Sequence, residues 1–254
     1  MAESPDERAA RSATAARKGA NAELPRRFYK QATAEPQGAG FAVLLDGKPV
    51  RTPGRKLLVV PRREVAEAAA AEWAAQGDTI NPATMPMTRL LNSAIDGVVG
   101  AEASIAADAA KYAGSDLICY RAEFPDPLIA LQAKHWDPVL AWAETKHGWR
   151  FVRCAGVIHV PQPEATLCGV AETTGRYDAY ALAGLHSMTT LMGSVLLALA
   201  VSRGRLTAAE AWTAAHVDED FQISQWGEDA EARARREHRW RDMQAAAMLG
   251  SDNI

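Results

Sequence analysis

Three side chains of the sequence could together carry out acid and base chemistry: Asp116, His135 and Asp137. A fold that brought them to one site would supply a general acid and a general base for a small-molecule substrate. None of the six histidines has a second histidine three or four residues away, the spacing that puts two imidazoles on one helix face. The sequence therefore predicts no metal centre, and a catalytic site around these three residues stands as an alternative function.

The motifs that usually mark a catalytic or cofactor site are absent from the sequence. It contains no G-x-x-x-x-G-K-S/T, His-Glu-x-x-His, Cys-x-x-Cys or G-x-S-x-G pattern. The run Gly38-Ala39-Gly40 precedes an expected strand and lacks the third glycine of a dinucleotide loop, so it predicts a turn. We expect no cofactor, and neither a disulfide framework nor a zinc site is indicated by the three cysteines, Cys119, Cys154 and Cys168.

The arginine-rich segment at residues 228–243 could bind phosphate groups if its charge were unbalanced. Its five arginines are matched by five acids, and the whole chain has a formal net charge of -3 at pH 7. Three acid and arginine pairs have i,i+4 spacing with the acid first, the order that favours a helix: Asp229/Arg233, Glu231/Arg235 and Glu237/Arg241. These patterns predict a solvated, self-paired helix and no nucleic-acid partner.

Short strand-like runs occupy the part of the chain that starts at residue 28. They cover residues 28–33, 40–45, 48–52 and 56–60. Asp46-Gly47 predicts a tight hairpin, because both central residues of a type I′ turn need a positive φ. An alanine-rich helix expected at residues 64–76, closed by Gly77, can cover one face of this small antiparallel meander.

The remainder of the chain shows the apolar spacing of helices. We expect one helix from about Pro86 and further helices at 101–113, 127–146, 173–202, 208–225 and 228–248. The one strand-like stretch, at 152–161, is a strand or an extended crossover. Trp136-Asp137-Pro138 has the pattern of a helix start, with Asp137 as N-cap. The apolar stripe within residues 188–199 predicts core, with a groove for a partner as the alternative.

These elements predict an α+β fold class, with a small N-terminal antiparallel β-meander with helix followed by a larger all-α C-terminal domain. We place a disordered tail at 1–24, the α+β domain at 25–95 and the helical domain at 96–254. The longest apolar run, residues 191–201, is far shorter than the roughly 20 residues of a membrane span. The cysteine usage and an N-terminus without an apolar h-region predict a bacterial cytoplasmic protein.

Short motifs in a fixed order link the chain to a known family. They are Arg27-Phe28-Tyr29-Lys30, Leu45-Asp46-Gly47-Lys48, Arg51-Thr52-Pro53, Glu72-Trp73-Ala74-Ala75-Gln76, Met85-Pro86-Met87-Thr88, Asp116-Leu117-Ile118-Cys119-Tyr120-Arg121, Trp136-Asp137-Pro138, Phe221-Gln222 and Trp226-Gly227. The series resembles the ATP synthase assembly chaperone family that attends the α subunit of the catalytic head, called assembly factor 2 in animals. The resemblance extends over residues 26–245.

The resemblance implies a chaperone without a cofactor that holds the free α subunit and acts as a monomer, with eukaryotic relatives in the mitochondrial matrix. In the family, a functionally important Glu follows the Trp-Gly pair. The matching position here is Glu231, or Glu228 if the register slips, and Trp226 and Glu219 complete the partner-binding candidates. The His-Asp pair that ends this stretch in the family is missing here. A plain alternative for Glu231 is an i,i+4 pair with Arg235.

Overall fold

A four-stranded antiparallel sheet opens the fold in the computed structural model, which describes residues 24–156 and 158–251. Strand β2 (Gly40–Leu45) lies at its centre and pairs with β1 (Ala32–Gln37), β3 (Lys48–Pro49) and β4 (Val59–Val60). The β1–β2 register joins Ala32 to Leu45 and Gln37 to Gly40. The expected meander is confirmed, whereas the tail placed at 1–24 lies almost wholly outside the described residues.

The hairpin between β2 and β3 has the geometry that its sequence predicts. Asp46 and Gly47 have φ angles of 46° and 78°, so both central residues of the turn lie in the left-handed region. The Asp46 carboxylate also accepts hydrogen bonds from the backbone N–H groups of Lys30 and Gln31, at 3.1 Å and 2.9 Å. The turn therefore fixes the chain that leads into β1.

We expected the first strand at residues 28–33, but β1 starts four residues later, at Ala32. The preceding residues run across helix α2 (Arg63–Ala74), where the Tyr29 hydroxyl donates to the Trp73 carbonyl oxygen at 2.7 Å. Helix α2 covers the sheet with a buried alanine and valine face. It ends before the Gly77 that we expected to close it, since the buried Gln76 side chain donates to Glu72 O at 3.0 Å and accepts from Asn81 N at 2.7 Å.

The chain after residue 81 is mainly helical, which confirms the α+β class. A 3-10 turn η1 (Pro82–Thr84) precedes α3 (Pro86–Ser93), which begins at the expected proline and continues into a π-helical turn, η2 (Ala94–Val98). The further elements are α4 (Glu102–Lys111), η3 (Tyr112–Ser115), η4 (Leu117–Cys119), α5 (Asp126–His147), α6 (Glu164–Thr174), α7 (Ala179–Met192), α8 (Val195–Ser202), α9 (Ala208–Ala215), α10 (Val217–Trp226) and α11 (Ala230–Gly250). None of the described helices is long and apolar enough to cross a membrane.

The long helix expected at 173–202 is two helices, α7 and α8, after residues 173–174, which end α6, and the helix expected at 208–225 is also two. Gly193 adopts φ 67° at the end of α7, and the Ser194 side chain accepts from Leu197 N at the start of α8. Such capping interrupts a helix even where the apolar pattern continues. His216 interrupts the second pattern between α9 and α10 with a non-helical φ of −114°.

One further local prediction is wrong. Asp137 and Pro138 lie inside α5 rather than at a helix start, and the neighbouring Trp136 is buried, with Nε1 donating to Ala214 O at 2.7 Å. This anchor and the surrounding packing outweigh the local cap signal. Among the described residues of 152–161, predicted as a strand-like stretch or an extended crossover, Cys154–Ala155 form β6, which pairs in parallel with β5 (Tyr120–Arg121).

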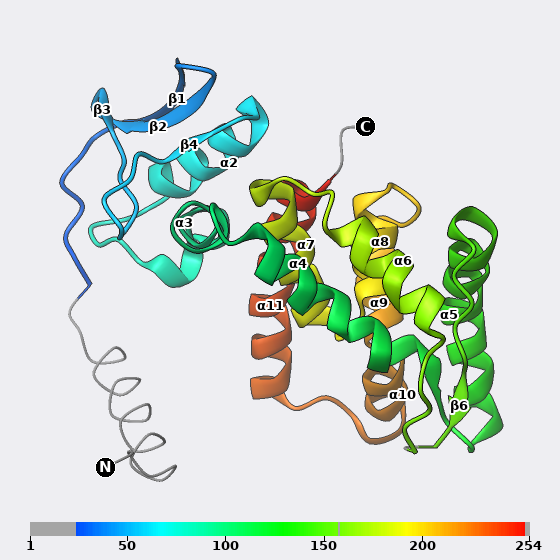
Figure 1. The fold of residues 1–254 in the computed structure, drawn as a ribbon. Helices are drawn as coiled ribbons and strands as arrows, with labels where there is room; N and C mark the ends of the chain where they lie inside the picture. Colours follow the sequence, from blue (N-terminus) through cyan, green and yellow to red (C-terminus); the bar gives the residue numbers. More distant parts are fainter. Residues whose placement is uncertain (1–23, 157, 252–254) are drawn as a thin grey trace, which may run out of the picture.

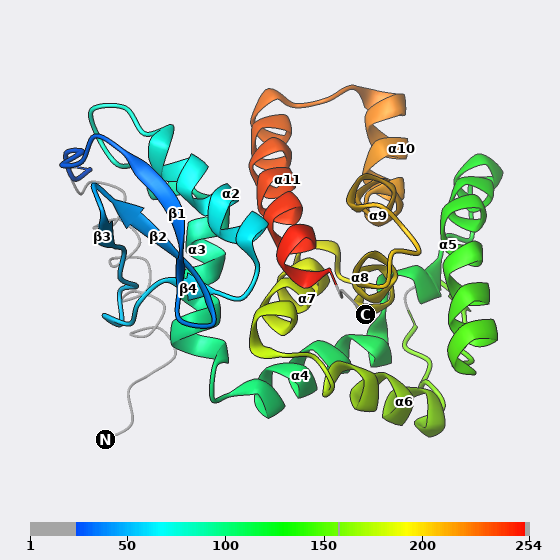
Figure 2. The ribbon, with the colours of Figure 1, turned by 90° about the horizontal axis from the view of Figure 1, so that it is seen from above.

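The sheet and α2 form one lobe, and the helices α4 to α11 form the other (Figures 1 and 2). Helix α7 lies at the centre of the second lobe and packs against α11, α8 and α4. Its apolar stripe continues into α8 and is buried, so the predicted core role of residues such as Met188, Val195 and Leu199 is confirmed. Helix α5 lies at the far end from the sheet (Figure 2).

Candidate functional site

The structure does not assemble the acid and base group considered for an enzyme. Asp116 is fully buried beside the start of α8, where its two carboxylate oxygens accept from the backbone N–H groups of Ile118 at 3.3 Å and Leu196 at 3.1 Å. Burial raises the pKa of Asp116 to about 6, against the lowering effect of these donors. The residue therefore joins η4 to α8.

His135 and Asp137, although both on α5, line two different surface hollows. Asp137 Oδ1 lies 2.7 Å from an Arg121 guanidinium nitrogen and 3.3 Å from one of Arg153, an arrangement that ties β5 and the segment before β6 to α5. No group of three or more metal-ligating side chains occurs within the described ranges 24–156 and 158–251. The three candidate enzyme residues thus lie apart, and Asp116 and Asp137 have structural roles.

The partner-binding candidates lie instead around the connection between α10 and α11, which we call the α10–α11 surface: Glu219, Trp226, Gly227, Glu228 and Glu231. Trp226 is the last residue of α10 and is 80% exposed. Gly227 follows with φ 84°, a conformation that favours glycine, and turns the chain towards α11. An indole this exposed at a fixed helix end is a ready anchor for another protein.

The three acidic side chains of this surface differ in their ion-pair partners. Glu231 Oε1 lies 2.6 Å from Arg235 Nη1 with both side chains exposed, so the predicted i,i+4 pair is present. Glu219 approaches His216 Nε2 at 3.9 Å. Glu228 is exposed and makes no ion pair in the part of the chain that the structure describes. Asp229, expected to pair with Arg233, instead caps α11 by accepting from Ala232 N at 2.9 Å.

An aromatic cluster and an ion pair hold the α10–α11 surface in place. Trp212 on α9 contacts His216 and the Trp240 ring of α11, with centroid separations of 4.0 Å and 5.6 Å. Burial lowers the pKa of His216, and its Nδ1 lies 2.7 Å from Trp212 O. Asp220 of α10 is paired with Arg236 of α11. The surface therefore rests on packed helices rather than on a free loop.

The structure also exposes apolar side chains that the sequence pattern did not single out. Phe28, Phe124 and Ile158 are exposed by 75%, 79% and 77%. Single exposed apolar residues are common, but three side chains this large and this exposed call for a reason. Phe28 belongs to a motif that carries the family resemblance, and this membership was the one available signal.

Comparison with known proteins identifies a matching family and solved structures with the same fold. The model of the ATP12 chaperone protein family matches residues 26–144. A chaperone candidate from Agrobacterium tumefaciens has a crystal structure with 47% identity and a TM-score of 0.84, covering 89% of this chain and 85% of that one. The crystal structure of Atp12 from Paracoccus denitrificans has 39% identity and a TM-score of 0.81, covering 89% and 97%. The mitochondrial protein atp12 of Schizosaccharomyces pombe is 23% identical over 219 residues, which are 81% of this chain and 75% of that protein.

These matches define a chaperone rather than an enzyme. The chain belongs to the ATP12 family of chaperones for ATP synthase assembly.

Proposed function

We propose that the chain binds the unassembled α subunit of the F-type ATP synthase catalytic head and covers its exposed interface until the β subunit takes that place. Membership of the ATP12 family supports the assembly role, and the α10–α11 surface supplies a place to bind. An unassembled subunit exposes an apolar interface that promotes wrong association, so a temporary cover lowers that risk. The observation that carries the proposal is the 80% exposed Trp226 on a rigid helix end with acids beside it.

In this proposal the indole of Trp226 is the apolar anchor, and Glu219, Glu228 and Glu231 select a basic rim on the α subunit. Aromatic anchors concentrate binding energy, and an acid that the contact desolvates against a partner cation adds to the affinity, whereas charges left exposed mainly raise the association rate. Glu228 has no ion pair within 4 Å in the described residues and interacts with Arg236 only at longer range, so it can turn to a partner cation at little internal cost. Glu231 would have to share or exchange its Arg235 partner.

Titration of the full chain with isolated α subunit tests the proposal. We expect a complex at micromolar concentrations or below, and Trp226→Ala should weaken it about 30-fold or more, the effect of losing an anchor worth at least about 2 kcal/mol. The matched control is Phe124→Ala, since Phe124 is 79% exposed on another part of the helical lobe. No association of the wild-type chain, or equal effects of the two substitutions, would contradict the proposal.

The same proposal includes the cellular setting and the organisation of the chain. We propose a monomer in the bacterial cytoplasm, supported by the bacterial origin of the two solved relatives, with related chaperones in the mitochondrial matrix. The domain division at residues 25–95 and 96–254 is part of this proposal, and sedimentation and separate expression of the two fragments test it. No nucleic-acid partner is proposed.

A further inference from the structure

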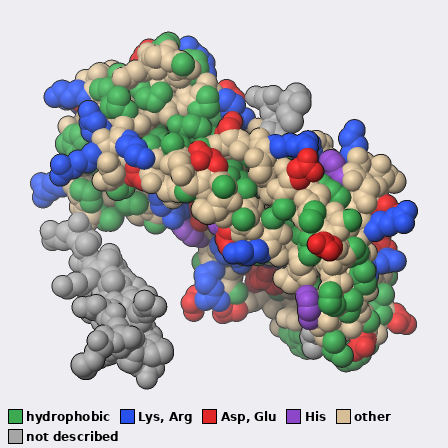
Figure 3. Space-filling model, viewed as in Figure 1, with side chains coloured by type: hydrophobic (Ala, Val, Ile, Leu, Met, Phe, Trp, Pro, Cys, Tyr) green, Lys and Arg blue, Asp and Glu red, His purple; other side chains and the backbone are tan. Residues whose placement is uncertain are grey.

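The strand-bearing segment is strongly basic although the chain is acidic overall. Residues 24–63 contain nine Lys and Arg but only two Asp and Glu, a net charge of +7, whereas residues 64–254 contain 15 and 25, a net charge of -10. Figure 3 shows Lys and Arg side chains around the sheet lobe with few acidic ones among them. Such a separation produces a local field that attracts anionic partners to one end of the molecule.

An aromatic hollow of about 400 Å³ lies on this basic lobe, between the segment before β1, the β2–β3 hairpin and α2. Phe28, Pro49 and Trp73 form apolar walls, and the Tyr29 ring makes edge contacts with Phe28 at 5.4 Å and Trp73 at 5.7 Å. Trp73 Nε1 is buried and has no hydrogen-bond acceptor among the described residues. The hollow is thus walled in part by an exposed aromatic side chain, Phe28, that adds little burial to the fold.

Two cations, Lys48 and Arg51, line the same hollow. Neither is within ion-pair distance of a carboxylate in residues 24–156 and 158–251, and Arg51 Nη1 donates only to the Arg55 carbonyl oxygen, at 2.8 Å. The one acid in the lining, Asp46, accepts from the backbone N–H groups of Gln31 and Lys30, which hold its pKa below the usual range, so it stays ionised and offsets one of the two cations. Lys48 and Arg51 nevertheless remain available to an external anion.

The acids of α2 do not neutralise these cations. Glu64 lies 3.6 Å from Arg62, and Glu67 lies 3.5 Å from Arg63. Glu72 faces the other way, and its carboxylate accepts from the backbone N–H groups at the start of α3. The positive charge at the hollow is thus not cancelled by the helix beneath it.

We propose that this hollow binds an extended acidic segment of a partner protein, with one apolar side chain of that segment against Phe28 and Trp73 and its carboxylates on Lys48 and Arg51. A nucleic acid fits less well, because two free cations neutralise little of a polyanion and the remaining -10 charge of the chain repels it. The proposal rests on the proposed function only for the identity of the partner, which would be the protein held by the chaperone.

The test uses the full chain and a fluorescein-labelled peptide with one phenylalanine among glutamates, followed by fluorescence anisotropy. We expect saturable binding that weakens with added salt, because the charges involved are exposed and screened. Replacing the peptide phenylalanine by serine, or its glutamates by lysines, should weaken binding about tenfold or more, as expected when an anchor or the charge complementarity is lost.

Variants of the chain locate the site. The double substitution Lys48→Glu/Arg51→Glu should weaken peptide binding about tenfold or more, because like charges then face each other. Lys146→Glu is the charge control, since this exposed lysine lies at the end of α5 away from the sheet. Phe28→Ala should weaken binding severalfold, whereas Phe124→Ala, equally exposed, should not. Phe28, Lys48 and Arg51 are all exposed, so the fold should tolerate these substitutions.

The proposal would be overturned by no binding of the acidic peptide, by equal effects of the site and control variants, or by tighter binding of a single-stranded DNA of equal charge. Self-association of the chain that depends on Lys48 and Arg51 would assign the hollow to a second copy and overturn it as well. A chain that binds the peptide but not the α subunit would contradict the proposed function alone. A chain that binds the α subunit but not the peptide would contradict this inference alone.

Discussion

Asp116 illustrates how a residue that could do chemistry is used instead to hold helices together. Its carboxylate accepts from Ile118 N and Leu196 N while being fully buried. We expect Asp116→Asn to lower the free energy of unfolding by about 1–3 kcal/mol, because the amide NH₂ would face one of these donors. Denaturant unfolding at neutral pH measures the effect. Asp108→Asn, at a half-exposed ion-paired site, should cost about 0–1 kcal/mol, and an equal loss in both variants would contradict the assigned role.

The raised pKa of Asp116 also predicts a pH dependence of stability. The folded-state pKa of about 6 lies above the ordinary value of 3.8, so between these values the folded chain keeps a proton that the unfolded chain has lost. This contribution is complete below pH 3.8 and is lost as the pH rises through about 6. The difference in unfolding free energy between wild type and Asp116→Asn should therefore change across this window. A pH-independent difference would show that Asp116 does not titrate there.

Glu231 and Glu228 distinguish partner contact from helix stabilisation. If Glu231 serves only as the partner of Arg235, Glu231→Gln should cost about 0.2–0.5 kcal/mol of stability and leave α-subunit binding intact. As members of the α10–α11 surface, Glu231→Gln or Glu228→Gln should weaken binding by about 2–5 kcal/mol where a partner cation is left desolvated. Affinity and thermal midpoint are measured together, with Glu172→Gln as control, because Glu172 forms an exposed i,i+4 pair with Arg176. Unchanged affinity in both variants would remove these acids from the surface.

At the scale of elements, carboxylates that lie in the family motifs or accept hydrogen bonds from them join neighbouring segments. Glu72 of α2 accepts from Met87 N at 2.6 Å and Thr88 N at 2.8 Å. The carboxylate of one motif thus caps the start of α3, which lies in another motif. Asp96 in η2 accepts from Thr52 Oγ1 and Gly54 N, both at 2.8 Å, and fixes the loop before β4. These contacts explain why the motifs contain such residue types without any catalytic role.

Helices α7 and α11 cross at two glycines, and this contact sets how closely they pack. A Cβ atom on Gly184 would lie 2.3 Å from Gly250 N and 2.6 Å from Ala246 O. We expect Gly184→Ala to destabilise the chain by about 1–3 kcal/mol, because the backbones would have to separate. Gly77→Ala is the control, since a Cβ there meets nothing within 4 Å. Chemical denaturation that finds Gly184→Ala as stable as wild type would show that α11 is free to shift.

The sequence predicted the elements whose signals are local and missed those that depend on distant packing. The Asp46-Gly47 turn and the start of α3 at Pro86 follow from backbone preferences alone, and both are confirmed. The break at Gly193 had a local signal that the continuous apolar run obscured. The identity of Trp226 as a candidate came from the resemblance, but its exposure follows from how α10 packs, which no local pattern encodes.

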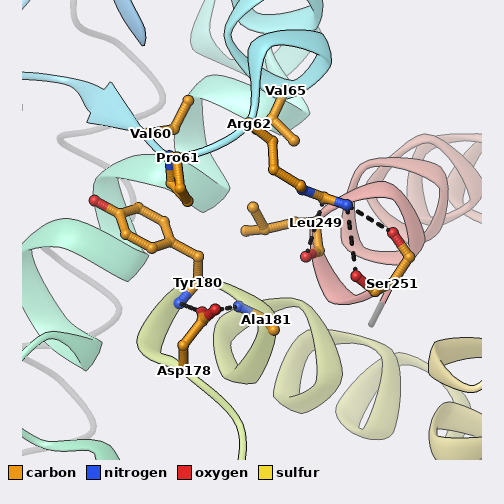
Figure 4. Close-up of a pocket in the computed structure, with 9 residues that line it drawn as sticks. All are labelled: Val60, Pro61, Arg62, Val65, Asp178, Tyr180, Ala181, Leu249 and Ser251. Atoms are coloured by element: carbon orange, nitrogen blue, oxygen red, sulfur yellow. Dashed lines mark hydrogen bonds between the residues drawn. The ribbon is translucent and has the colours of Figure 1, made fainter. Parts of the chain in front are cut away.

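At the scale of the whole molecule, the two lobes meet where α11 ends against the sheet lobe (Figure 4). A pocket of about 190 Å³ lies at this junction, lined by residues from β4, the start of α2, α7 and the end of α11. The Tyr180 hydroxyl donates to Val59 O at 2.9 Å, and the Arg62 guanidinium donates to carbonyl oxygens at the end of α11. Since α11 also carries Glu231, this junction connects the sheet lobe to the helix that bears part of the α10–α11 surface.

Arg62 is the single side chain whose removal should loosen this junction most. Its guanidinium donates to Ser251 Oγ at 2.9 Å and to the Met248 and Leu249 carbonyls, which complements the negative end of the α11 dipole. We expect Arg62→Met to lower the unfolding free energy by about 1–3 kcal/mol, because the carbonyls and the Ser251 hydroxyl at the end of α11 lose a charged donor. Amide exchange should accelerate in the last turn of α11 and change little in β2.

The control Arg63→Met removes a neighbouring exposed arginine that pairs with Glu67, and it should cost about 0–1 kcal/mol. Unchanged exchange at the end of α11 in Arg62→Met would mean that Arg62 does not hold this helix end, and that the packing of α11 against α7 and α3 is sufficient.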